Sequence, residues 1–353
     1  MKSKNLIYLV SSATPKGVLE SQVFNIANYI NQNYKHNIKI ILVGKKINIK
    51  KLECPINIEF HFLNETISIK EISNSNIYIR GVDIFLKYFI TLKLNKNKLI
   101  YDFRALAFVE SYLRNSSYLR SICLFFLEMT TYYLADEICC VSNVLKNKLK
   151  KYFILHRRIF VFPCLIIGAN QRNNKLVNNL DSTIKFVYLG SLSPWQKFDK
   201  TIDLFKLLSQ KINCKLTIIS NDNLEVQTVL KKKDVTAKIL SLKHSEVLIE
   251  LKNHHFGFLI RDNNLLNNIS SPIKYLEYIS SGVIPVVTQG IGDYTEEVIT
   301  NNIGIVLTNN FEIDVSNIIK MHVDQSLNKR TNDYYSYNYN IKNRIKNHPM
   351  LNY

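Results

Sequence analysis

The chain has 353 residues, which is too long for one ordinary hydrophobic core and fits two domains of typical size. Its hydrophobic content of 46% and aromatic content of 11% exclude a disordered chain. The formal net charge of +18 is uneven, since residues 1–170 carry 24 Lys and Arg against 11 Asp and Glu. Such an excess attracts phosphate-bearing partners or an anionic membrane surface, although a solvated surface with lysines set by codon usage explains it as well.

Apolar runs of strand length alternate with amphipathic runs of helix length through the first half, a pattern typical of parallel sheets covered by helices. The predicted strands are 6–10, 38–43, 56–62, 77–79, 99–101, 138–141 and 159–162. The predicted helices are 20–32, 83–94, 117–134 and 143–152, the last with Ser142 as its N-cap.

Residues 167–183 are polar and rich in Asn, which predicts a linker, and the alternation then restarts. The second half has predicted strands at 184–189, 216–219, 256–260, 284–287 and 303–307, and predicted helices at 200–211, 245–252, 273–280 and 294–300. We therefore expect an N-terminal domain over 1–166 and a C-terminal domain over 184–322. A basic tail rich in Asn and Tyr, residues 323–353, belongs to neither sheet and is a candidate for packing back on the N-terminal domain.

The six cysteines show no CxxC and no His-Cys spacing, so the sequence predicts no metal site and a reducing, cytoplasmic environment. Cys139 and Cys140 are expected to be buried thiols in a strand. The apolar segment 5–10 is short and has no cleavage context, and it is interpreted as a first strand and not a signal peptide. No window reaches the ~18 uncharged apolar residues of a membrane span. The closest, Tyr118–Leu134, is interrupted by charges and predicts a buried helix or one lying at an interface.

The strongest local signal is the segment 270–287, which reads SSPIKYLEYISSGVIPVV. Pro272 opens a helix whose free N–H groups and positive dipole end suit a diphosphate, and Lys274 adds a charge in the first turn. Glu277 lies one turn further along, where a carboxylate accepts hydrogen bonds from a ribose diol. Gly282 ends the helix and turns the chain into the next strand. The alternative is a capped helix with Glu277 on its surface.

This segment resembles the donor-binding motif of the glycosyltransferase family 4 group, S-x-P-x-K-x-x-E-Y-x-x-x-G-x-P-V-V. The resemblance implies an α/β chain of the GT-B type, with two Rossmann-like domains facing a central cleft. It implies transfer from a nucleoside-diphosphate sugar as co-substrate, with retention of anomeric configuration and without a metal or other cofactor. On this basis Lys274 is a catalytic candidate, and the donor-binding candidates are Ser271, Pro272, Ile273 and Glu277.

Other parts of the second half resemble the same family in the expected order. Gly190 stands in the glycine loop after the first strand, Ser191 occupies the position where an Arg is usual, and Lys197 is the counterpart of a diphosphate-binding Lys. Arg261, directly after a strand, is a catalytic candidate that supplies the missing charge. Gly290 lies in a glycine-containing loop at the cleft edge. Relatives often carry a second Glu where this chain has Ile269, so backbone groups, Asn267 and Asn268 are candidates for contacting the sugar.

The first half resembles the family less. Gly17 and Glu20 follow the first strand and are acceptor-side candidates, although they serve equally well to cap a helix. Asp102 and Arg104 follow another strand, where relatives have an Asp-x-Arg. We interpret Asp102 as the general base and Arg104 as an acceptor contact, with a buried structural pair as the alternative.

These observations predict transfer of a hexose-type residue to a glycan or lipid-linked glycan, as in the synthesis of surface polysaccharides such as capsule or O-antigen. The basic excess and the segment Tyr118–Leu134 are the basis for two of these predictions. One is the lipid-linked acceptor, and the other is peripheral contact with an anionic membrane at its inner, cytoplasmic face. A nucleotide-sugar epimerase and a catalytically silent GT-B binding protein are the alternatives within this architecture. A nucleic-acid-binding protein is disfavoured, because it leaves the glycine loop and Glu277 unexplained.

Overall fold

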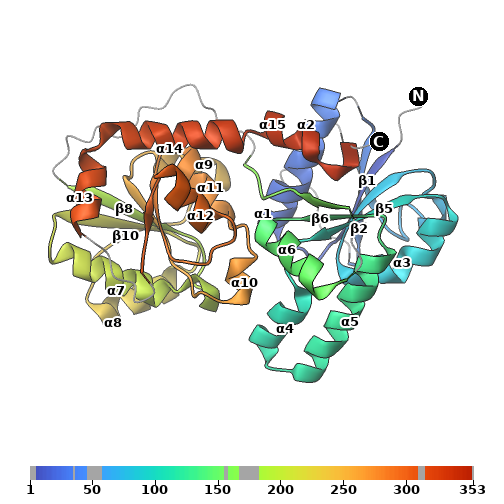
Figure 1. Ribbon diagram of the computed structural model, residues 1–353, viewed down its shortest axis with the longest axis horizontal. Helices are drawn as coiled ribbons and strands as arrows, with labels where there is room; N and C mark the ends of the chain where they lie inside the picture. Colours follow the sequence, from blue (N-terminus) through green and yellow to red (C-terminus); the bar gives the residue numbers. More distant parts are fainter. Residues whose placement is uncertain are drawn as a thin grey trace. The chain divides into compact units, whose positions relative to one another are not determined.

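A computed structural model describes residues 5–34, 36–45, 58–154, 158–166, 183–308 and 315–351 (Figure 1). The chain divides into two compact units, Met1–Ile167 with Arg344–Tyr353 and Gly168–Asn343. The sequence-based linker 167–183 lies outside the described residues except for Thr183.

Unit 1 is built on a parallel seven-stranded sheet in the order β3-β2-β1-β4-β5-β6-β7. Its strands are β1 (Leu6–Ser11), β2 (Ile38–Val43), β3 (Glu59–Phe62), β4 (Asn76–Arg80), β5 (Lys98–Phe103), β6 (Glu137–Cys140) and β7 (Ile159–Val161). The central strands are continuous Ile, Leu, Val and Tyr runs because helices cover both faces of the sheet (Figure 1). Cys139 and Cys140 are fully buried in β6, as predicted.

The helical elements of unit 1 begin with two α-helical segments that a π-helical turn joins. They are α1 (Lys16–Leu19), the π-helical η1 (Glu20–Phe24), α2 (Asn25–Tyr34), the 3₁₀ turn η3 (Ile69–Glu71), α3 (Val82–Leu94), α4 (Ala107–Asn115), α5 (Tyr118–Leu134) and α6 (Asn143–Tyr152). Ser142 caps α6 as predicted, since its Oγ accepts a hydrogen bond from the Leu145 N–H at 3.1 Å. Helix α4 ends with Ser116 in the left-handed conformation, and α5 begins directly afterwards.

Unit 2 is built on a parallel six-stranded sheet in the order β10-β9-β8-β11-β12-β13. Its strands are β8 (Ile184–Leu189), β9 (Cys214–Ile219), β10 (Lys238–Leu240), β11 (Phe256–Leu259), β12 (Ile284–Val287) and β13 (Ile305–Val306). Its helices are the 3₁₀ turn η4 (Pro194–Gln196), α7 (Phe198–Ser209), α8 (Asn223–Lys233), α9 (His244–Leu251), α10 (Leu265–Asn268), α11 (Ile273–Ser280), α12 (Tyr294–Asn301), α13 (Val315–Val323) and α14 (Gln325–Asn338). The two parallel sheets with covering helices confirm the predicted α/β class.

Helix α8 and strand β10 were not predicted from the sequence. Helix α8 buries only Val226 and Leu230, so it lacks the apolar stripe that predicts a helix, and β10 is three residues long. Strand β10 pairs with β9, and α8 packs on α7, so burial against neighbouring elements stabilises both where the local pattern is weak.

The segment 323–353 is mostly helical. Helix α14 packs on α11, where Asn328 Nδ2 donates to the Gly282 carbonyl at 2.8 Å and Asn332 Nδ2 donates to the Ser280 carbonyl at 2.6 Å. These amides satisfy carbonyls at the C-terminal end of α11. The chain then forms α15 (Ile341–Arg344), η5 (Ile345–Asn347) and η6 (Pro349–Leu351), and its last residues belong to unit 1. There His348 is buried against Tyr78.

Among the described residues, no helix has both the length and the apolar character needed to cross a membrane.

Candidate functional site

Helix α11 presents two charged side chains to the interior of unit 2. Lys274 is 6% exposed and Glu277 is 5% exposed, so Glu277 is not a surface residue. Their i,i+3 spacing sets them on one face of the helix. Pro272 precedes the helix, and its N-terminus has no side-chain cap. Two buried, oppositely charged groups within one turn are therefore the starting point of the site.

The Lys274 ammonium lies among polar and aromatic partners. Its Nζ donates to Gln196 Oε1 at 2.6 Å and stands 4.7 Å from the centre of the Tyr188 ring. Burial lowers the pKa of Lys274 well below its ordinary value, and the charge of Arg261 lowers this pKa further, while Glu277 opposes the shift. An anion bound here would restore the charged form.

Arg261 supplies a second buried cation just past the end of β11. Its backbone N–H donates to Thr288 Oγ1 at 2.9 Å, and its Nη1 donates to Asn267 Oδ1 at 3.3 Å and Ser270 Oγ at 3.2 Å. Burial lowers its pKa to about 10. The guanidinium is thus fixed by neutral groups, and its Nε has no hydrogen-bond partner among the described residues.

Glu277 is the carboxylate of this cluster. Burial raises its pKa to about 7, and Lys274 moderates that rise. A carboxyl group with this pKa changes charge near neutral pH, so its hydrogen-bonding to a ligand diol depends on pH in the same range.

The glycine loop after β8 comes close to these groups. Gly190 has φ +135°, and a Cβ at this position would lie 2.8 Å from Lys274 Nζ. Ser191 lies on the same loop, with its Oγ 2.9 Å from Ser193 Oγ and its carbonyl accepting from the Tyr188 hydroxyl. Only glycine allows both this backbone conformation and the approach of the lysine.

Lys197 differs from the two buried cations. It adopts φ +46° before α7, and its Nζ forms an ion pair with Asp262 at 2.6 Å. Both side chains are about one-third exposed, at 32% and 35%. Lys200 also approaches Asp262, at 3.8 Å. The charge of Lys197 is therefore neutralised by a carboxylate, whereas Arg261 is hydrogen-bonded to neutral side chains.

The remaining donor-side candidates lie around the loops before α11 and after β12. Ser271 Oγ lies 2.7 Å from the Tyr294 hydroxyl, Pro272 is buried, and Ile273 is the first residue of α11. Gly290 has φ +73° and faces the Asn263 and Asn268 amides, which leave no space for a side chain. Ile269, which replaces the carboxylate expected from the family, is fully buried.

The fold of the whole chain matches solved glycosyltransferase structures. HepE of Anabaena, in complex with UDP and glucose, has a TM-score of 0.70 at 12% identity, with 97% of both chains covered. A glycosyltransferase of Rickettsia africae has a TM-score of 0.68 at 14% identity, covering 98% of this chain and 97% of the other. The sucrose-phosphate synthase of Thermosynechococcus elongatus has a TM-score of 0.70 at 10% identity, covering 97% and 96%. The chain has the GT-B fold.

No protein-family model and no curated protein matches the sequence. Membership of family 4 therefore stays a prediction from the motif, and the identities of 10–14% concern the fold. A fold hosts many functions, so the function of this chain depends on the geometry of its side chains.

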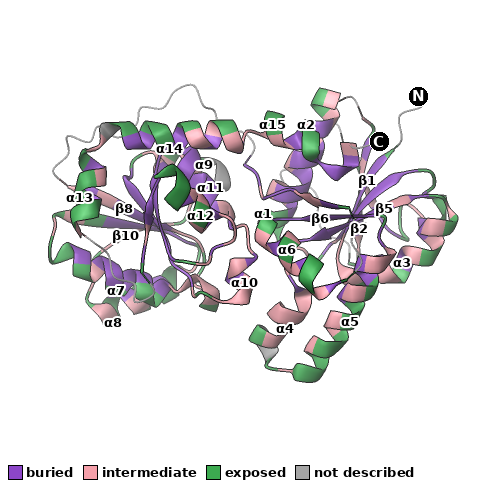
Figure 2. Cartoon of the chain, viewed as in Figure 1, coloured by how far each residue is buried: buried purple, intermediate pink, exposed green. Residues whose placement is uncertain are grey.

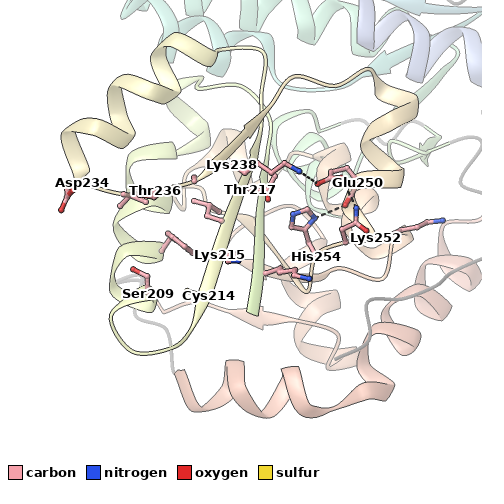
Figure 3. A pocket seen from close by; sticks show the side chains of 16 residues that line it. Ser209, Cys214, Lys215, Thr217, Asp234, Thr236, Lys238, Glu250, Lys252 and His254 are labelled. Atoms are coloured by element: carbon pink, nitrogen blue, oxygen red, sulfur yellow. Dashed lines mark hydrogen bonds and ion pairs between the residues drawn. The ribbon is translucent and has the colours of Figure 1, made fainter. Parts of the chain in front are cut away.

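Two pockets of unit 2 lie at opposite ends of its six-stranded sheet. One, of about 390 Å³, is lined by Arg261, Thr288, Gln289 and their neighbours, at the carboxyl ends of β11 and β12. The larger, of about 860 Å³, lies where β8 and β9 begin, among Lys185, Lys215 and His254 (Figure 3). Open parallel sheets bind ligands beyond the carboxyl ends of their strands, so the smaller pocket is the relevant one.

In unit 1, Asp102 is held by two arginines. Its Oδ2 accepts from Arg104 Nε at 2.7 Å and from Arg80 Nε at 2.9 Å, and its side chain is fully buried. Burial raises the pKa of Asp102, but the two guanidinium groups outweigh burial and hold this pKa below its ordinary value. A general base must reach the hydroxyl that it deprotonates, so this geometry favours a positioning role.

The other acceptor-side candidates lie at the start of the first helix. Glu20 forms an ion pair with the exposed Lys16 at 3.6 Å. A Cβ added to Gly17 would meet no atom within 4 Å. Arg80 and Gln196 were missed by the sequence analysis. Arg80 is the last residue of a strand, and a position at a strand end is also what made Asp102 a candidate. No sequence pattern points to Gln196.

The crowding at Gly190 gives a testable expectation. Gly190→Ala should displace the Lys274 ammonium and strain a residue with φ +135°, lowering the free energy of unfolding by about 1–2 kcal/mol. Thermal unfolding measures the loss, and Gly17→Ala, which meets no crowding, serves as the stability control. Equal midpoints for both variants would show that the Gly190 loop relaxes freely.

Proposed function

We propose that this chain is a glycosyltransferase that moves a sugar from a nucleoside-diphosphate sugar to a glycan or lipid-linked glycan. The observation that carries the proposal is the pair of buried cations, Lys274 and Arg261, gathered with Glu277 beyond the carboxyl ends of β8 and β11. Solved neighbours of the same fold have been seen with UDP and with UDP-glucose, which makes a UDP-sugar the first donor to test.

In the proposed reaction, the bond between the sugar and the diphosphate breaks as the sugar carbon bonds to the acceptor oxygen. Lys274, Arg261 and the N-terminus of α11 stabilise the negative charge that develops on the departing diphosphate. The diphosphate takes up the proton of the acceptor hydroxyl. Asp102, buried beneath two arginines, positions those arginines in place of the base role that the sequence predicted.

Glu277 and the 390 Å³ pocket account for the nucleoside in this proposal. The Glu277 carboxylate accepts hydrogen bonds from the ribose diol, and the pocket beside Arg261 receives the base. Because Ile269 replaces the second family carboxylate, recognition of the sugar hydroxyls passes to groups such as Asn267 and Asn268. Retention of configuration and a reaction without metal remain parts of the proposal that rest on the family motif.

A screen of the purified protein against UDP-, GDP-, CMP- and dTDP-sugars tests the proposal. A bound nucleotide sugar should raise the unfolding midpoint, and the protein should release nucleoside diphosphate slowly in water and faster with an acceptor. No response to any nucleotide would contradict the proposal. Binding without release indicates a silent binding protein, and a changed sugar still attached to nucleotide indicates an epimerase.

Helix α5 supports the proposed contact with an anionic membrane at the cytoplasmic face. Its outer face carries Leu119, Ile122 and Phe126, which are 75%, 53% and 54% exposed, at the i,i+3,i+7 spacing of an amphipathic helix (Figure 2). Phe153, directly after α6, packs on Phe125 of α5 with ring centres 5.8 Å apart. This contact brings the end of α6, with the exposed Lys150 and Lys151, close to α5.

Vesicle flotation tests this surface. The triple variant Leu119→Ser, Ile122→Ser, Phe126→Ser should bind phosphatidylglycerol vesicles at least about tenfold more weakly than the native chain, since each buried apolar side chain contributes roughly 1 kcal/mol or more. The matched control is Leu224→Ser with Ile249→Ser, which removes equally exposed apolar side chains from unit 2. Equal binding by the native chain and the triple variant would contradict the membrane contact.

A further inference from the structure

Unit 1 contains a buried cluster in which two arginines share a single carboxylate oxygen. Arg80 ends β4, and Arg104 follows directly after β5. Both guanidinium groups contact Asp102 Oδ2, at 2.8 Å from Arg80 Nη2 and 2.7 Å from Arg104 Nε. The side chains of Arg80 and Arg104 are 11% and 20% exposed. The two arginines therefore lie at the carboxyl edge of the parallel sheet, where open α/β sheets bind ligands.

The cluster has more donors than acceptors. Among the described residues, Nη1 of Arg80 makes no hydrogen bond, and its Nη2 contacts Asp102 Oδ2 as an ion pair. The Nη atoms of Arg104 reach only the Tyr78 hydroxyl at 3.4 Å and the Cys164 sulfur at 3.9 Å. Guanidinium groups normally use such fork-shaped donors on oxyanions in pairs. Asp102 Oδ1 also has no hydrogen-bond partner among the described residues, but one carboxylate cannot occupy all the donors of two guanidinium groups, which carry five N–H groups each.

The cluster also has one uncompensated positive charge. Among the described residues, Asp102 is the carboxylate that contacts these two arginines. His348, buried nearby, adds no counter-charge, since burial lowers its pKa to about 3 and leaves it neutral. Asp83, in the first turn of α3, is exposed to solvent. One arginine would neutralise Asp102, so a second arginine that only braced the strands would add a buried charge without a partner.

We propose that Arg80 and Arg104 form an oxyanion-binding subsite that takes a phosphate or carboxylate group of the acceptor. The proposal rests on the proposed glycosyl transfer for the identity of the ligand as an acceptor. Asp102 fixes the two guanidinium groups from below, and their remaining Nη donors hold the oxyanion. The acceptor is then selected as an anionic molecule, either a lipid phosphate or a sugar acid.

Inorganic phosphate is the first probe, and it is applied to a Lys274→Met background to weaken phosphate binding on the donor side, where Arg261 remains. Phosphate at about ten times its dissociation constant should raise the unfolding midpoint by roughly 2–5 °C. Adding Arg104→Gln should abolish this shift while leaving the phosphate-free midpoint unchanged or higher, because a neutral Arg80–Asp102 pair remains. Arg104→Lys keeps the charge and should retain part of the response.

Two results would overturn the subsite. The first is the absence of a phosphate shift in the Lys274→Met background. The second is a phosphate-induced rise of the unfolding midpoint that is equal with and without Arg104→Gln. If Arg104→Gln also lowered the midpoint without phosphate, Arg104 would have a structural bracing role. Octyl phosphate and methyl glucuronide then separate a lipid phosphate from a sugar carboxylate as the source. The nucleotide-sugar screen of the native chain is an independent readout, so failure of glycosyl transfer and failure of the subsite are distinguishable.

Discussion

Lys274→Met is expected to lower kcat about 10²–10³-fold while stabilising the ligand-free protein. The loss follows because Lys274 is one of two buried cations available to the departing diphosphate, and removal of one such contact in a buried site has effects of this size. The stabilisation follows because Lys274 is buried with its pKa well below the ordinary value, so its charged form is unfavourable in the empty site. Methionine fills a similar volume without a charge.

The sign of the pH dependence of Lys274 follows from proton binding. Between the folded pKa and the ordinary value of 10.5, the unfolded chain binds the proton and the folded chain does not. The free energy of unfolding therefore rises with pH in this window, and the gain from Lys274→Met is largest below it and disappears above it. Denaturant unfolding at a series of pH values measures the gain.

Binding of the donor should reverse this shift. A diphosphate beside Lys274 raises the pKa of the ammonium group, so that binding takes up a proton at any pH where the free site is neutral. Calorimetry in two buffers of different ionisation enthalpy measures the uptake, which Lys274→Met should remove. Lys215→Met, an exposed lysine at the opposite end of the sheet, is the control and should change neither quantity. Unchanged kcat in Lys274→Met would show that the donor site lies elsewhere.

Glu277→Gln is expected to weaken donor binding about 10–100-fold and to stabilise the ligand-free protein above pH 7. The carboxylate accepts two ribose hydroxyls in the proposed complex, whereas a carboxamide offers one acceptor oxygen and loses the charge. Burial raises the pKa of Glu277 to about 7, so the folded chain binds more protons than the unfolded chain between about 4.5 and 7. The free energy of unfolding falls with rising pH across that window, and glutamine should recover about 1–3 kcal/mol at pH 8.

Donor titrations at several pH values test the role of Glu277. Affinity of the native chain should fall as pH drops below about 7, when the carboxyl group becomes protonated, and Glu277→Gln should show no such fall. A 2′-deoxyribose donor is the matched control ligand, because it removes one of the hydroxyls that the carboxylate would accept. If Glu277→Gln weakened ribose and deoxyribose donors equally, the proposed diol contact would be wrong.

The sequence motif predicted that two of the donor-side candidates lie close together, because a single helix carries them. The S-x-P-x-K-x-x-E spacing puts Lys274 and Glu277 on one face of α11, and this local relation needs no tertiary information. Gly190 and Arg261 were found because each follows an apolar strand, and carboxyl ends of parallel strands share one edge of a sheet. Gln196, which accepts from Lys274, lies in a short turn whose position no periodicity predicts.

By itself, the sequence determined the α/β class, most strands and helices, and the spacing of the donor motif, because these depend on periodicity and on neighbours a few residues apart. Only the tertiary structure decided the electrostatic state of the site. Burial, which depends on the whole fold, shifts Lys274 towards its neutral form and raises the pKa of Glu277 to about 7. The same is true of Asp102, where strand pairing brings Arg80 and Arg104 onto one carboxylate oxygen and favours a positioning role over the predicted base.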